Sequence, residues 1–140
     1  MTQAPKPVGA YTPVVRAGGW LVVSGQVGIG ADGQMASGGT SSELRQAIAN
    51  LAAQLATQGA RLDQVVKTTV FLRHMSDYTV MNEVYIEGFG DHRPARSAVG
   101  VAELPIGALV EIEAWAWVGD VDDVDDTDDT DDTDDTDDTA

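Results

Sequence analysis

The spacing of hydrophobic residues divides most of the chain into five strands and two helices. Runs rich in β-branched and aromatic residues predict strands over residues 11–16, 20–27, 65–73, 96–101 and 109–118. Apolar residues three and four apart predict one helix from Thr40 to Gly59 and a second over residues 76–88. The order β-β-α-β-α-β-β predicts an α+β domain, a sheet with both helices on one face.

Short polar signals mark the ends of these elements. Ala17-Gly18-Gly19 separates the first two strands and predicts a hairpin. Thr40 and Glu43 have the spacing of a capping box, in which the two side chains accept hydrogen bonds from free N–H groups at a helix start. Gly59 predicts the end of that helix, because glycine readily adopts the left-handed conformation of a C-terminal cap.

The last predicted strand has two faces of different character, because successive side chains of a strand point to opposite sides. One face carries Val110, Ile112, Ala114, Ala116 and Val118, and the other carries Glu111, Glu113, Trp115 and Trp117. If the apolar face packs against the helices, two indoles remain on the other face, and soluble chains rarely expose such a surface. We therefore expect a homo-oligomer that covers them. Scattered surface aromatics are the alternative.

The net charge of -15 is concentrated at the carboxyl end. Thirteen aspartates lie between positions 120 and 138, so ten of the 23 acidic residues remain to balance the eight basic ones. The repeated triplets VDD and TDD offer too few apolar residues for a core, which predicts a folded domain over residues 1–118 and a disordered acidic tail over residues 119–140. A calcium site is the alternative, but the tail lacks the glycine and glutamate of an EF-hand loop.

The remaining composition narrows the classes of function. The chain has no cysteine and only two histidines, so we expect neither a disulfide framework nor a metal site. No stretch has the pattern of a signal peptide or a membrane span, which predicts a cytoplasmic protein without a membrane partner. The basic residues form no cluster and the acidic tail would repel a polyanion, so we expect no nucleic-acid binding.

Arg96 and Glu111 are the candidate chemical groups. Arg96 heads a run of small and apolar residues, a position that folding alone explains poorly. A guanidinium remains charged and can bind a carboxylate through two parallel hydrogen bonds. Glu111 could transfer protons to or from water beside such a ligand. The residues alone leave two interpretations open: a site for a small acid, or a structural ion pair between Arg96 and Glu111.

Six short motifs occur in a specific order and spacing along residues 5–118. The motifs are Gly9-Ala10-Tyr11, Val23-Ser24-Gly25-Gln26, Val66-Lys67-Thr68-Thr69-Val70-Phe71-Leu72, Asn82-Glu83-Val84-Tyr85, Arg93-Pro94-Ala95-Arg96-Ser97 and Val110-Glu111-Ile112-Glu113-Ala114. Each motif alone is a weak signal, but the whole set is specific. Through this set the chain resembles the YjgF/RidA family, the reactive intermediate deaminases.

The resemblance implies a chorismate-mutase-like α+β fold, with a mixed sheet and two helices on one face, assembled as a homotrimer with clefts between subunits. It also implies cofactor-independent hydrolysis of 2-enamine and 2-imine acids, such as 2-aminoacrylate and 2-iminopropionate, to 2-keto acids and ammonia. By matching residues, Arg96 is expected to hold the substrate carboxylate and Glu111 to orient or activate water. The other positions expected to line the cleft are Tyr11, Ser24, Asn82 and the backbone at Ala98.

Five positions depart from the family pattern, among them Trp115 and Trp117, which are bulkier than the residues common there. Ala10 and Gly28 stand where proline is usual, which suggests looser loops around Tyr11 and Ser24, and Ala98 stands where some relatives carry cysteine. Some branches of the family lack deaminase activity, so a non-catalytic small-carboxylate-binding or chaperone-like interaction module is the alternative function. Arg96 favours the enzyme, because the non-deaminating branches commonly lack this arginine.

Overall fold

A computed structural model describes residues 3–119, and the predicted tail over residues 119–140 lies outside this range except for its first residue. Five strands form one sheet in the order β1-β2-β5-β3-β4. In chain order the elements are β1 (Val14–Ala17), β2 (Trp20–Gln26), α1 (Thr40–Ala56), β3 (Val65–Leu72), α2 (Tyr78–Phe89), β4 (Ala95–Gly100) and β5 (Val110–Trp117), with short 3-10 turns at Leu62–Gln64, Met75–Asp77 and Pro105–Gly107.

The sheet is mixed because of one crossover connection. The chain passes from β3 through α2 to β4, and these two strands are parallel, whereas the other neighbouring strands are antiparallel. The predicted number, order and type of elements are thereby confirmed for the described part of the chain. None of the helices within residues 3–119 has the length and apolar character needed to cross a bilayer.

The first strand is shorter than predicted. The hairpin at residues 17–19 is present, with Gly18 at φ 60° and Ala17 paired with Trp20. However, β1 begins at Val14 rather than at position 11. Pro13 has no N–H to donate to a strand ladder, although its carbonyl accepts a hydrogen bond of 2.9 Å from the Ser24 N–H. Residues 11–13 therefore follow the sheet edge as an irregular segment.

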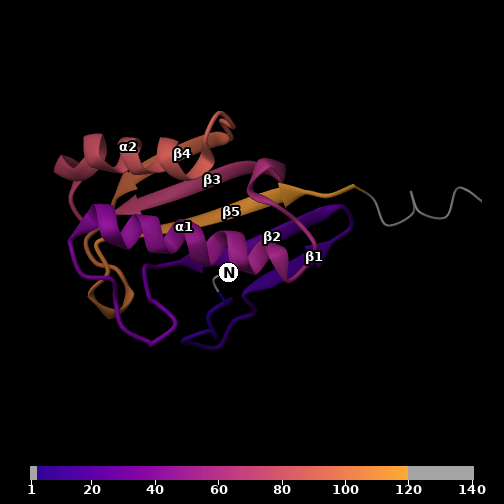
Figure 1. Ribbon diagram of the computed structural model, residues 1–140, viewed down its shortest axis with the longest axis horizontal. Coiled ribbons are helices and arrows are strands. Elements are labelled where there is room, and N and C mark those ends of the chain that lie inside the picture. The colour runs from indigo at the N-terminus through magenta and orange to yellow at the C-terminus, as the bar shows by residue number, and fades with distance from the viewer. Residues whose placement is uncertain (1–2, 120–140) are drawn as a thin grey trace, which may run out of the picture.

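Both helices lie over the same face of the sheet, with α1 crossing β5 and β2 (Figure 1). The inward residues of β5, from Val110 to Ala116, are fully buried beneath them. On the opposite face Trp115 and Trp117 remain 45% and 42% exposed, so the predicted division of the last strand is confirmed. The helices contribute Leu44, Ala47, Ile48, Leu51, Leu55, Met81, Val84, Tyr85 and Phe89 to the core.

The predicted start of α1 at Thr40 is confirmed, but the predicted capping box is wrong. Thr40 is already the first helical residue, Gly39 occupies the N-cap, and no side chain caps the helix. The Thr40 hydroxyl instead donates to the Asp77 carboxylate at 2.6 Å, and the Glu43 carboxylate accepts a 2.8 Å hydrogen bond from the Leu109 N–H. Both side chains bind the turns that precede α2 and β5. The two side chains therefore bind residues distant in sequence and not the N–H groups at the start of their own helix.

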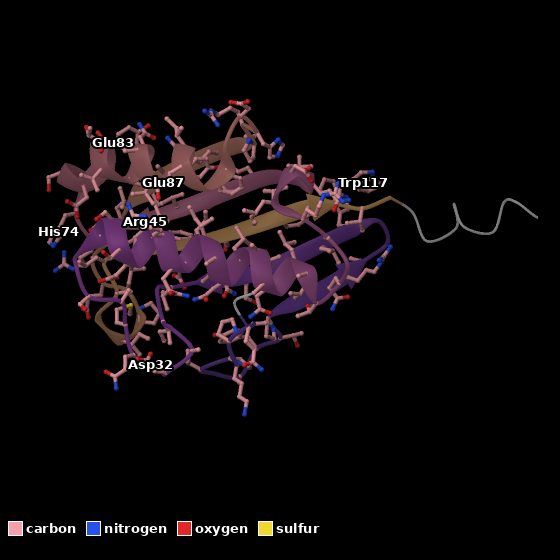
Figure 2. The ribbon with its side chains drawn as sticks, in the orientation of Figure 1. Asp32, Arg45, His74, Glu83, Glu87 and Trp117 are labelled. Atoms are coloured by element: carbon pink, nitrogen blue, oxygen red, sulfur yellow. The ribbon has the colours of Figure 1, made fainter. Side chains whose placement is uncertain are left out.

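The two helices are also linked at their exposed surface. Arg45 of α1 and Glu87 of α2 point toward one another (Figure 2), with 2.6 Å between Arg45 Nε and Glu87 Oε2. The paired carboxylate raises the pKa of Arg45, and the guanidinium lowers the pKa of Glu87. Because both side chains are solvent-exposed, the pair contributes little to stability. The buried apolar residues hold the helices in place.

Gly28 lies in a tight contact rather than in the looser loop that its replacement of proline suggested. A Cβ at this position would lie 2.5 Å from the Glu43 carbonyl oxygen. We expect Gly28→Ala to lower the free energy of unfolding by about 1–3 kcal/mol, because the loop must move away from α1. Urea unfolding measures this change. Gly30→Ala is the matched control, since its Cβ would lie 3.2 Å from Asp32 Oδ1, at the end of a side chain, and in ordinary contact with the Gln34 carbonyl oxygen at 3.8 Å. Equal stability of the two variants would contradict the prediction.

Candidate active site

Arg96 projects from β4 toward α2. It pairs with Thr68 of β3, whose side chain is fully buried on the helix-covered face. Its guanidinium Nη2 donates a 3.0 Å hydrogen bond to the Tyr78 hydroxyl, and its central carbon lies 4.7 Å from the centre of the Tyr85 ring and 5.6 Å from that of Tyr78. Two aromatic rings and one hydroxyl therefore hold this cation in a defined orientation.

The aromatic partners are themselves anchored. The Tyr85 hydroxyl lies 2.8 Å from the Thr68 hydroxyl in the buried layer between α2 and β3. Burial raises the pKa of Tyr85, so its phenol remains neutral beside Arg96. The sulfur of Met81 lies 3.6 Å from Arg96 Nη1 and closes the inner side. These contacts orient the guanidinium and leave its positive charge uncompensated.

Within residues 3–119, no carboxylate lies within 4.0 Å of the Arg96 guanidinium; the two ion pairs found there are Arg45–Glu87 and Arg61–Asp63. The structural ion pair between Arg96 and Glu111, one of the two interpretations left open by the sequence, is therefore not formed. With no counter-ion in the part of the chain that the structure describes, this half-buried arginine has N–H donors available for an anion.

Glu111 lies on the opposite face of the sheet from Arg96. It pairs with Phe71 of β3, whereas the helix-facing residues of β5, such as Ile112, pair with Val70. The backbone of Gly25 in β2 lies against its carboxylate, since a Cβ on Gly25 would be 2.5 Å from Glu111 Oε2. The β2–β5 pairing shifts register between Val23 and Gln26, at this same point. Glycine and an irregular ladder together make room for the glutamate side chain.

The environment of Glu111 favours its protonated form. Burial raises the pKa of this carboxyl, and the charge of Glu113 on the same face raises it further. No cationic group of the described residues forms an ion pair with it. A carboxyl whose pKa is closer to neutrality both accepts and returns a proton more readily, which suits general acid–base chemistry.

Ser24 precedes Gly25 on β2, and Tyr11 lies in the irregular segment before β1. The Ser24 hydroxyl donates to the Thr12 carbonyl at 2.7 Å, which ties the irregular segment to β2, and the Tyr11 hydroxyl accepts a 3.2 Å hydrogen bond from the Val8 N–H. Tyr11 and Gly25 also line a cavity of about 420 Å³ between the N-terminal segment, the end of β2 and α1. Neither Arg96 nor Glu111 lines that cavity.

Asn82 and Ala98 lie on the Arg96 side. Ala98 is two residues beyond Arg96 on β4, on the same face, and packs against the core. Asn82 is half-buried on α2, one turn after Tyr78. The predicted site residues thus fall into two groups, one between β4 and α2 and one at the β2–β5 junction. A single copy of the chain does not bring the groups together.

Sequence reasoning missed three residues of these groups: Tyr78, Tyr85 and Gly25. Tyr78, Met81 and Tyr85 have helical spacing on one side of α2, and this spacing does not distinguish core residues from site residues. Met81 and Tyr85 are buried, whereas Tyr78 is 38% exposed and contacts Arg96. Among the described residues, no group of three or more His, Asp or Glu side chains is placed to hold a metal ion.

Known proteins resemble the chain along almost all of the folded region. The profile of the family described as Endoribonuclease L-PSP matches residues 1–118. A RutC family protein of Pyrococcus horikoshii is 44% identical over 115 residues, covering 81% of this chain and 91% of the relative. A 2-iminobutanoate/2-iminopropanoate deaminase of Mus musculus is 43% identical over 119 residues, covering 84% and 88%.

Solved structures share the architecture as well. The crystal structure of E. coli TdcF with bound serine superposes with a TM-score of 0.77 at 32% identity, covering 82% of this chain and 93% of that one. Sequence and fold therefore agree, and the chain belongs to the Endoribonuclease L-PSP family, which is the YjgF/RidA family.

Proposed function

We propose that the protein hydrolyses small 2-imino acids, and their 2-enamine tautomers, to 2-keto acids and ammonia. The observation that carries this proposal is the Arg96 guanidinium, oriented by Tyr78 and Tyr85 and lacking a carboxylate partner in residues 3–119. The relative from Mus musculus is named as a deaminase of this kind, and TdcF binds serine, a small molecule with a carboxylate.

In the proposed reaction Arg96 binds the substrate carboxylate. Two charge-assisted hydrogen bonds to a fixed guanidinium restrict the position of the adjacent C=N carbon. Water then adds to that carbon while the imine nitrogen takes up a proton, which gives a carbinolamine. Collapse of this intermediate forms the C=O bond and breaks the C–N bond, releasing ammonia. No electrons are gained or lost, so the chemistry requires positioning and proton transfer.

Glu111 supplies the proton transfer. As a carboxylate it takes a proton from the attacking water, and as a carboxylic acid it returns one to the leaving nitrogen. Its raised pKa, caused by burial and by Glu113, brings both forms closer to neutral pH. The imine carbon is already electrophilic, so a positioned general base is sufficient and no protein nucleophile is needed.

Arg96 and Glu111 lie on opposite faces of the sheet, and we infer from this that one substrate contacts both where two copies of the chain meet. Trp115 and Trp117 remain 45% and 42% exposed beside the Glu111 face, and a second copy would bury them. We therefore include the homotrimer in the proposal, with each site formed by the Arg96 group of one subunit and the Glu111 group of its neighbour.

Mixing two inactive variants tests this arrangement. Arg96→Ala and Glu111→Gln subunits, unfolded together, refolded at a 1:1 ratio and assayed for 2-iminopropanoate hydrolysis, should recover about a quarter of the wild-type activity, since one site in four pairs intact groups from two subunits. Light scattering of the same samples measures the subunit number. Stable trimers of mixed composition without any recovered activity would contradict a shared site.

A carboxylate-binding module without catalysis is the second candidate, and the serine bound to TdcF favours keeping it. In such a module Arg96 would bind the ligand carboxylate with the same geometry. Purified wild-type protein separates the two: release of ammonia and keto acid from a freshly generated imine, above the uncatalysed rate, supports the enzyme. Binding of 2-oxobutanoate without any turnover supports the module.

A further inference from the structure

Tyr78 places a free hydroxyl proton beside the carboxylate-binding arginine. It is the first residue of α2, 38% exposed, and its oxygen accepts the 3.0 Å hydrogen bond from Arg96 Nη2. A phenol that accepts one hydrogen bond still has its own O–H to donate. Within the described residues this proton has no acceptor, since the Arg96 contact is the one hydrogen bond found for the Tyr78 hydroxyl.

Tyr85 makes a useful comparison because it also lies over Arg96. Its hydroxyl is buried and bonded to Thr68, so it stabilises the core and cannot reach a ligand. Tyr78 has the reverse environment: its ring contacts the guanidinium while its hydroxyl lies at the surface. One tyrosine therefore supports Arg96 from inside, and the other extends the polar surface that Arg96 presents.

We infer that Tyr78 is a substrate-binding residue, which donates its hydroxyl proton to the same carboxylate that Arg96 binds. This inference rests on the proposed function, and it adds a specificity determinant to that site. The Arg96 hydrogen bond polarises the phenol and makes it a stronger donor. A carboxylate has two oxygens with about four acceptor positions, enough for the guanidinium and the hydroxyl together. A neutral ligand would gain much less binding affinity from the Arg96 guanidinium and the Tyr78 hydroxyl.

Tyr78→Phe removes the hydroxyl and keeps the ring. We expect the Kd of 2-oxobutanoate, measured by calorimetry, to rise about tenfold, the effect of losing one hydrogen bond to a charged group. The KM for 2-iminopropanoate should rise by a similar factor while kcat changes less than about twofold. Thr79→Val is the matched control: it removes an exposed hydroxyl one residue further along α2 and should leave Kd and KM unchanged.

A double-mutant cycle separates direct binding from support of Arg96. If the hydroxyl contacts the ligand, Tyr78→Phe weakens 2-oxobutanoate binding in the Arg96→Lys background as well. No further weakening in that background would overturn the inference, and so would a wild-type Kd for Tyr78→Phe alone. A folded wild-type protein that binds 2-oxobutanoate without imine turnover would refute the proposed function and leave Tyr78 testable by this cycle. Absence of any carboxylate binding would refute both.

Discussion

Replacing Arg96 with lysine should lower kcat/KM for 2-iminopropanoate hydrolysis by about 100-fold or more, and alanine should abolish detectable activity. The planar guanidinium forms two parallel hydrogen bonds to a carboxylate and lies over the ring of Tyr85, whereas an ammonium is a point charge that does neither in the same geometry. Hydrogen bonds to charged groups contribute about 1.5–3 kcal/mol each, so losing the paired geometry accounts for a change of this size.

A coupled keto-acid assay measures the effect, with the imine generated in the same cuvette. Arg61→Lys is the matched control, because Arg61 is exposed and pairs with Asp63 away from the site. The control should retain wild-type kinetics. Thermal unfolding establishes that the Arg96 variants are folded. If folded Arg96→Ala hydrolyses the imine at the wild-type rate, the proposed function is wrong.

Replacing Glu111 with glutamine should lower kcat by about 10²–10⁴-fold with little change in KM, because an amide cannot transfer protons at neutral pH. Wild-type activity should fall as the pH drops through the raised pKa of Glu111, since protonation removes the base. Glu113→Gln is the informative neighbour. Its charge raises the pKa of Glu111, so removing it should move this fall in activity to lower pH.

Glu111→Gln lowers activity, but it should slightly raise the stability of the folded protein. Burial and the charge of Glu113 hold the pKa of Glu111 in the folded protein above the ordinary value of a glutamate, so folding disfavours the charged form. This penalty is absent below the unfolded pKa, grows as the pH rises from the unfolded to the folded pKa, and is constant above the folded pKa. Glu111→Gln should therefore be slightly more stable than the wild type at pH 7 and equally stable near pH 3, as measured by urea unfolding. Lower stability of Glu111→Gln at pH 7 would contradict this account.

Such a result is typical of a functional residue whose environment suits chemistry rather than folding. The contact between Gly25 and Glu111 adds to this interpretation, because the backbone of β2 gives way to the carboxylate at the register shift. Any side chain on Gly25 would occupy the space of the carboxylate.

Two details of the chain illustrate where local signals misled. Thr40 and Glu43 have the spacing of a capping box, but their side chains bind Asp77 and Leu109, which are distant in sequence. Tyr78 and Met81 have core-like helical spacing, but Tyr78, at the first position of α2, is 38% exposed and its hydroxyl accepts a hydrogen bond from Arg96 of β4. In both cases the side chain contacts a residue that is distant in sequence, and local spacing does not indicate that contact.

Hydrophobic periodicity by itself determined the five strands, the two helices and the two faces of β5, because these depend on neighbours a few residues apart. The motif order also determined the family and the identities of Arg96 and Glu111 as candidates. Only the tertiary structure decided where Arg96 and Glu111 lie relative to each other. The register of β3 with β4 and β5 sets them on opposite faces of the sheet, and such pairing between distant segments cannot be read from local periodicity.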